Sequence, residues 1–145
     1  MTGLPLVRRL ALVGVLVALA GGPAPAAAPQ LPPGEGVFCA AAILALAAEV
    51  GARCFPGQDS GLQAELRQSV ARIDAFILQN SSTTPAELET FKKEQAHVGA
   101  PAAVLCQGDA SDLYLGLRKG GPNPIRENTD LLVSRPGPPT WGTCL

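Results

Sequence analysis

The sequence feature that most restricts the fold is a nearly continuous run of apolar residues at positions 37–50. The run is rich in alanine and leucine, contains no proline, and is interrupted by a single charged residue, Glu49. Alanine and leucine are strong helix formers, so we expect a helix over residues 37–53. The run before Glu49 is shorter than the roughly 20 apolar residues that span a bilayer. A helix that is apolar all round must be buried on all sides, so we expect the other helices to pack around it.

A stripe of large apolar side chains predicts the second helix. These residues recur at intervals of three and four positions, which places them on one helical face: Leu62, Leu66, Val70, Ile73 and Ile77. Polar residues such as Glu65 and Arg72 fall on the other side. Ser60 and Gln63 have the spacing of a capping box at the start of this helix. We expect Asn80 to end it, because asparagine tolerates the left-handed conformation.

A second capping box predicts the third helix. Thr84 is followed by Pro85 and Glu87. This order gives a capping hydroxyl, a proline at the first helical position and a glutamate that reaches back to the cap. We expect this helix to run to about His97 and the chain to leave it at Gly99.

The rest of the chain predicts shorter helices and a tail. One helix is expected to begin near Pro101 and to end at residues 120–121, with Gly108 either inside it or breaking it. A last short helix, capped by Asn123 and Pro124, is expected to carry Ile125, Leu131 and Leu132. Residues 136–144 are rich in proline and predict an irregular C-terminal tail. The fold is therefore predicted to be all-α, a small disulfide-stapled bundle of four to five helices around the Ala/Leu-rich helix.

The first residues have the composition of an export signal. Arg8 and Arg9 precede an apolar stretch at 10–20, and small residues and prolines follow at 21–28. This order is typical of a secretory signal peptide. We expect residues 1–26 to be removed, with Ala26 as the preferred end and Ala28 as the alternative. Gly22 stands where a lipoprotein signal would have its cysteine, so no lipid anchor is expected.

The predicted signal divides the chain into three parts and sets its location. Residues 27–36 are expected to form a flexible segment, and residues 37–145 a single helical domain of a size that builds its own core. The mature protein is predicted to be periplasmic or secreted, with no stable membrane anchor after cleavage. It is also more acidic than the full chain, because the two arginines of the signal are lost.

Four cysteines follow the signal: Cys39, Cys54, Cys106 and Cys144. An even number in an exported chain predicts two disulfides. No two are spaced as a C-x-x-C pair, which excludes a thioredoxin-like redox motif and a zinc knuckle. In an up-and-down arrangement the third helix returns the chain to the C-terminal end of the first. We therefore predict a Cys54–Cys106 bridge and, from the remaining two cysteines, a Cys39–Cys144 bridge that holds the tail over the start of the first helix.

Composition and motifs exclude several classes of function. The chain has 11 basic and 12 acidic residues, whereas a nucleic-acid binder needs a concentrated basic surface. It has one histidine, and its one methionine is the initiator, so multi-histidine and methionine-rich metal sites are excluded and no cofactor is expected. His97 is interpreted as a side chain whose partial positive charge interacts favourably with the C-terminal end of the third helix. Asp109 and Asp112 are interpreted as acids at a helix start.

These exclusions favour a protein without catalytic activity. Glu49 and Arg53, spaced four residues apart, are interpreted as an ion pair rather than as catalytic groups. The function predicted is a protein-binding module whose partner is another envelope or secreted protein. Trp141 and Phe55 are the candidate partner contacts, because aromatic anchors dominate many interfaces. The alternatives are an envelope-acting hydrolase with two carboxylates in one cleft and a carrier with an enclosed apolar pocket.

Overall fold

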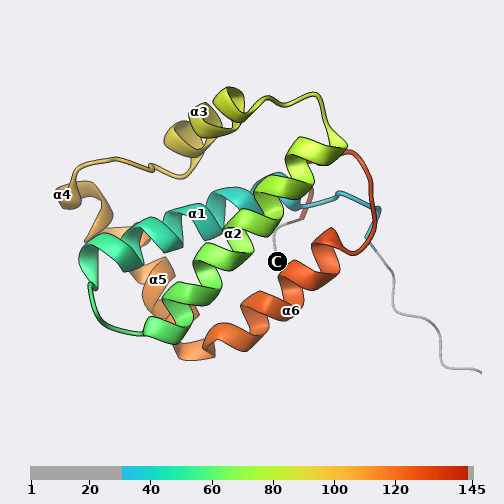
Figure 1. Cartoon of the computed structure of the whole chain (residues 1–145). Coiled ribbons are helices and arrows are strands. Elements are labelled where there is room, and N and C mark those ends of the chain that lie inside the picture. The colour runs from blue at the N-terminus through green and yellow to red at the C-terminus, as the bar shows by residue number, and fades with distance from the viewer. Residues whose placement is uncertain (1–30, 144–145) are drawn as a thin grey trace, which may run out of the picture.

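The computed structural model describes residues 31–143, which form six helices and no strand (Figure 1). The predicted signal peptide at 1–26 lies outside the described residues. The helices are α1 (Val37–Cys54), α2 (Ser60–Asn80), α3 (Pro85–Gln95), α4 (Ala102–Leu105), α5 (Gly108–Gly120) and α6 (Pro122–Val133). The all-α prediction is confirmed. The count of four to five helices is too low, because the helix predicted to begin near Pro101 is interrupted before Gly108 and forms two helices, the short α4 and a separate α5.

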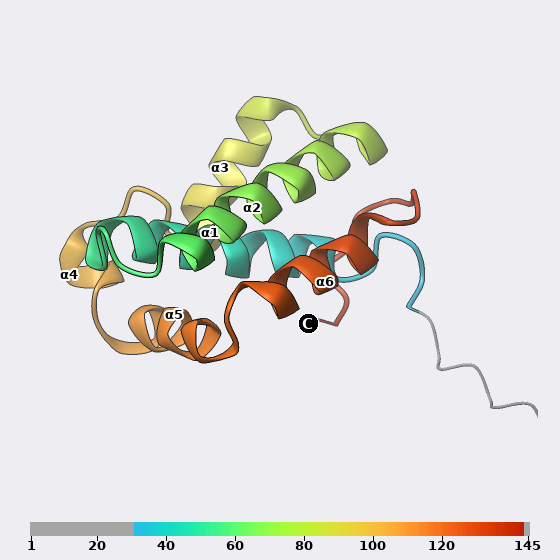
Figure 2. The ribbon, with the colours of Figure 1, turned by 60° about the horizontal axis from the view of Figure 1, so that its bottom comes forward.

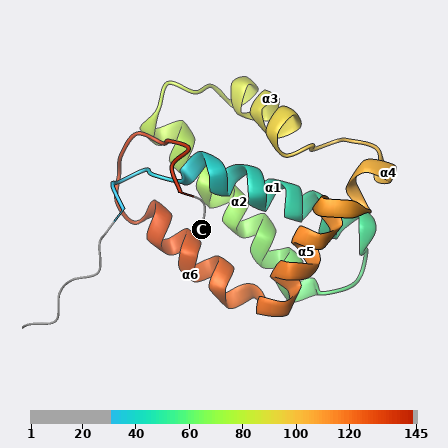
Figure 3. The ribbon, with the colours of Figure 1, turned by 180° about the vertical axis from the view of Figure 1, so that it is seen from behind.

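The predicted apolar helix, α1, contacts α2, α3, α4 and α5 (Figure 3). Val37, Ala47 and Val50 are fully buried, and no residue of α1 before Ala52 is exposed. By its 18 residues and a mean hydropathy of 1.8, α1 is long and apolar enough to cross a membrane, but the core helix of a soluble protein passes the same test. Its alanines are small, so the neighbouring helices approach its backbone closely.

α6 lies beside α2 and runs in the same direction (Figures 1 and 2). The Nε of Arg126 donates to Oε2 of Glu65 at 3.0 Å. Further along both helices, Arg72 of α2 forms an ion pair with Asp130 of α6. Glu65 was predicted to face away from the core, which is wrong. It is buried because α6 covers that side of α2, and it also accepts a hydrogen bond from the Ser69 hydroxyl at 3.1 Å.

The three large apolar residues predicted for the last helix differ in their burial on α6. Ile125 is buried and Leu132 packs against the core, but Leu131 is 71% exposed. Thr129 takes a fully buried position on the face of α6 that meets α2. Neighbouring residues on a helix point about 100° apart, so only one of the two consecutive leucines faces the core.

The two predicted capping boxes have different outcomes. At α3 the Thr84 N–H donates to Oε2 of Glu87 at 2.7 Å, and the Glu87 N–H donates to Oγ1 of Thr84 at 3.3 Å, which confirms the prediction. At α2 the prediction is wrong: Asp59 is the N-cap, with a φ of 50° and no side-chain capping bond. Gln63 instead donates to the carbonyl oxygens of Phe55 and Gln58 and so closes the turn between α1 and α2.

The predicted Cys54–Cys106 disulfide joins the end of α1 to the residue that follows α4. Its Cα atoms are 5.3 Å apart. α3 runs back along α1 toward this end, so the chain returns to Cys54 as predicted (Figure 1). Cys144, the predicted partner of Cys39, lies outside the described residues.

The predicted ion pair of Glu49 and Arg53 holds the loop between α3 and α4 on α1. Its atoms are 3.4 Å apart. Oε1 of Glu49 also accepts from the Gly99 N–H at 3.2 Å, and the Arg53 guanidinium donates to the carbonyl of Ala100. The two side chains are partly exposed, and the chain between α3 and α4 is hydrogen-bonded to both. This arrangement supports a structural role.

Tyr114 of α5 fills the space between α5 and the end of α1. Its side chain is fully buried, and its ring stacks on Phe55 with centroids 4.9 Å apart. The ring lies directly over Gly51, where an added Cβ would be 2.6 Å from Tyr114 Cε2. Gly51 is thus a position where the absence of a side chain permits the helix contact.

Candidate interaction surface

Three aromatic side chains from distant parts of the chain meet near the N-terminal end of α1. Phe38 belongs to α1, Phe91 to α3 and Trp141 to the C-terminal tail. The ring centroids are 5.5 Å apart for Phe38 and Phe91, 6.2 Å for Phe38 and Trp141, and 5.7 Å for Phe91 and Trp141. We call these three residues the aromatic cluster. Both phenylalanines are half-buried, whereas Trp141 is 50% exposed.

The tail positions Trp141 through backbone contacts with residues 34–38. The Thr140 N–H donates to the Gly34 carbonyl at 2.9 Å, and the Phe38 N–H donates to the Thr140 carbonyl at 3.2 Å. The backbones approach so closely that a Cβ on Gly34 would lie 2.2 Å from the Pro138 carbonyl oxygen. This contact involves residues of the segment predicted to be flexible, of which 31–36 are described. The backbone immediately before Trp141 is therefore fixed against the start of α1.

Replacing Gly34 with alanine should displace the tail and expose Trp141 further. Gly34 has a φ of +83°, which costs an alanine roughly 1–2 kcal/mol, and the new Cβ would collide with Pro138. Because the chain has a single tryptophan, its fluorescence reports this surface directly. We expect the emission of Gly34→Ala to shift to the red and to be quenched more strongly by acrylamide.

Gly57→Ala is the matched control for this prediction. Gly57 has a φ of +75°, but nothing lies within 4 Å of an added Cβ. It therefore imposes a similar backbone strain without a collision. If both variants leave the emission unchanged, the tail does not depend on the close approach at Gly34.

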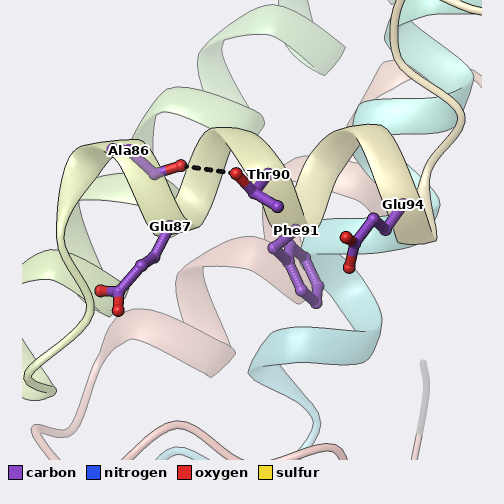
Figure 4. A pocket seen from close by; sticks show the side chains of 5 residues that line it. All are labelled: Ala86, Glu87, Thr90, Phe91 and Glu94. Atoms are coloured by element: carbon purple, nitrogen blue, oxygen red, sulfur yellow. Dashed lines mark hydrogen bonds between the residues drawn. The ribbon is translucent and has the colours of Figure 1, made fainter.

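A shallow hollow of about 330 Å³ lies along one side of α3, next to the aromatic cluster (Figure 4). Its lining residues all come from α3: Ala86, Glu87, Thr90, Phe91 and Glu94. Phe91 belongs to both the hollow and the aromatic cluster, and the other four residues are exposed. The hollow is therefore open to solvent, unlike the enclosed pocket expected of a small-ligand carrier.

The hollow contains two carboxylates, which bears on the predicted hydrolase alternative. Glu87 and Glu94 are seven residues apart, or about 10 Å along the helix axis. The backbone N–H and the hydroxyl of Thr84 both donate to Glu87, and these hydrogen bonds hold its pKa below the usual value of 4.5. A carboxyl that serves as a general acid needs a raised pKa. The direction of this shift suits a helix cap and opposes a catalytic acid.

Phe55, the other predicted partner contact, lies far from Trp141. It follows the last residue of α1, whereas Phe38 is near the first, and the 18 residues of α1 extend over about 27 Å. Phe55 is half-buried and stacked on Tyr114. The structure thus separates the two predicted contacts and surrounds Trp141 with two phenylalanines that were not predicted to contribute to a site.

The remaining candidate polar residues form no second site. His97 is exposed and has a φ of 52° just beyond α3, and Asp109 lies in the first turn of α5. Within residues 31–143, no group of three histidine, cysteine or acidic side chains is arranged to hold a metal ion. Comparison of the chain with protein-family models, with curated proteins and with solved structures found no match.

Proposed function

We propose that the protein is an exported, non-catalytic module that binds another envelope or secreted protein through the aromatic cluster. The observation that supports this function is the position of Trp141. Its indole remains half exposed although it contacts two other aromatic rings and although its backbone neighbour is hydrogen-bonded to α1. Exposed tryptophans that are fixed in place are frequent anchors of protein interfaces.

Fixing the indole before binding favours affinity. A side chain that is free in solution loses rotamer entropy when a partner immobilises it, at about 0.5–1.5 kcal/mol. Phe38 and Phe91 already restrict the indole, so this cost is reduced for Trp141. A partner that covers its exposed half gains apolar burial at roughly 25 cal/mol per Å².

The proposal includes the parts of the architecture that hold the cluster together. In it, the helical domain is built around α1, the tail lies over the start of α1, and a Cys39–Cys144 bridge fixes the tail covalently. Such a bridge requires an oxidising compartment, which agrees with export by a cleaved signal peptide. Loss of the bridge would release the segment of the tail that carries Trp141.

Capture of partners from the envelope and secreted fractions of the source organism tests this function. The tagged mature protein is crosslinked to its neighbours, and the captured proteins are identified by mass spectrometry. We expect a specific partner that is lost with Trp141→Ala and retained with Leu131→Ala. The second variant is the matched control, because it removes an apolar side chain that is 71% exposed on α6. Retention of the partner by Trp141→Ala would contradict the proposal.

A further inference from the structure

The exposed side of α3 is acidic next to the aromatic cluster. Glu87 and Glu94 both line the hollow, with Phe91 between them in the sequence (Figure 4). Lys92 does not neutralise them, because its Nζ is bound to Asp74 at 2.8 Å and to Glu89 at 2.9 Å on another side of the helix. In the described part of the chain, Glu94 has no ion pair or hydrogen bond from its side chain.

A third carboxylate, that of Glu35, lies beside the residue that follows Trp141. A Cβ built on Gly142, the residue after Trp141, would be 2.3 Å from Cγ of Glu35 and 3.2 Å from its Cδ. Acidic side chains therefore come from two parts of the chain, from α3 around Phe91 and from residue 35 beside Gly142. An aromatic face next to carboxylates attracts a cation twice, through the ring quadrupole and through the negative charge.

We propose that the hollow receives a lysine or arginine side chain of the partner, so that the ligand of this surface is a basic polypeptide segment. The inference rests on the proposed function and specifies the chemistry of the partner. The aliphatic stem of the basic side chain packs on Phe91, and its charge meets Glu94 beside the indole of Trp141. Glu87 and Glu94 are about 10 Å apart along α3, close to the rise of about 9 Å for one turn of a polyproline II segment, in which residues three positions apart share a face. A segment with basic residues three positions apart therefore matches both carboxylates.

A peptide titration tests the proposal directly. The probe is acetyl-Gly-Arg-Ala-Leu-Arg-Gly-amide, which has no tryptophan, and the signal is the fluorescence of Trp141. The control peptide has citrulline in place of both arginines, which keeps the shape and removes the charge. We expect the arginine peptide to give a saturable change at up to millimolar concentrations, and to bind at least about tenfold more tightly than the citrulline peptide.

Charge-neutral variants of the protein locate the effect. Glu94→Gln should weaken binding of the arginine peptide by about tenfold, since a hydrogen bond to a charged group is worth about 1.5–3 kcal/mol. Glu87→Gln should weaken it too, and glutamine at this position still permits the capping box, so α3 is retained. Glu127→Gln on α6 is the matched control, because Glu127 is exposed and lies outside the hollow.

Three outcomes would overturn the inference. The first is equal binding of the two peptides, and the second is the absence of a saturable fluorescence change with the arginine peptide. The third is that Glu127→Gln weakens binding of the arginine peptide as much as Glu94→Gln does, which would show that only the net charge of the protein matters. The partner-capture experiment separates this failure from that of the proposed function. A captured partner that is lost with Trp141→Ala but retained with both Glu94→Gln and Glu87→Gln would leave the binding module in place and remove the basic segment as its ligand.

Discussion

Replacing Cys54 and Cys106 together with alanine should lower the free energy of unfolding by about 4 kcal/mol. The two cysteines are separated by 52 positions. In the chain-entropy model, closing a loop of that length lowers the entropy of the unfolded chain, which destabilises the unfolded state by about 4 kcal/mol. The bridge also holds a weak element, since α4 has four residues and only Leu105 of them is buried. Urea denaturation followed by circular dichroism measures the difference, and the alanine pair leaves no new free thiol.

Hydrogen exchange shows whether the loss is local as well as global. We expect the amides of residues 99–107 to lose protection first, because the contacts that remain there are the packing of Leu105 in the core and the hydrogen bonds of Glu49 and Arg53 with the loop. Exposed ion pairs contribute about 0–1 kcal/mol, so they do not replace the bridge. A loss of stability below about 1 kcal/mol would show that packing alone holds α4 and α5 against α1.

The elements with strong local signals were predictable from the sequence. The composition of α1 predicts a helix with no alternative, and the capping box at Thr84 predicts the start of α3. Both signals act within a few residues of the backbone that they shape. The return of α3 along α1 follows from short connections between successive helices, and it was sufficient to select Cys54–Cys106 from the three possible pairings of four cysteines.

Most of the errors lie where the outcome depends on another part of the chain. The periodicity of α2 identifies one apolar face, but it does not show that α6 will cover Glu65 on a second face. For the same reason, Leu131 could not be distinguished from Leu132 by hydrophobicity alone. The false capping box at Ser60 has a local cause, because Gln63 closes the preceding turn and Asp59 takes the N-cap position.

The candidate surface was predictable only in part. Trp141 was identified as the single tryptophan in an irregular tail, but no spacing in the sequence relates it to Phe38 and Phe91. One signal was present: the predicted Cys39–Cys144 bridge places the tail over the start of α1, where Phe38 precedes Cys39. The position of Phe91 depends on how α3 packs on α1, which the apolar pattern of a short helix does not determine.

Replacing Tyr114 with alanine should destabilise the protein by about 3–5 kcal/mol, the range for truncating a large buried aromatic side chain. Tyr114 is fully buried, stacks on Phe55 and covers Gly51, so its removal leaves a cavity between α5 and the end of α1. Tyr114→Phe is the matched control. It keeps the ring and removes a hydroxyl whose bond to Asp59 is long, at 3.4 Å, so we expect a loss of about 1 kcal/mol or less. Urea denaturation compares the three proteins.

A double-mutant cycle shows whether the ring and Gly51 act as one contact. Gly51→Ala alone should cost about 1–3 kcal/mol, because its Cβ would lie 2.6 Å from the Tyr114 ring. In the Tyr114→Ala background the collision is absent, and alanine is a better helix former than glycine by about 1 kcal/mol. The same substitution should then become neutral or stabilising. If its cost is unchanged in that background, the helix at Gly51 is restricted by a neighbour other than Tyr114, and the close approach of α5 to α1 does not depend on this glycine.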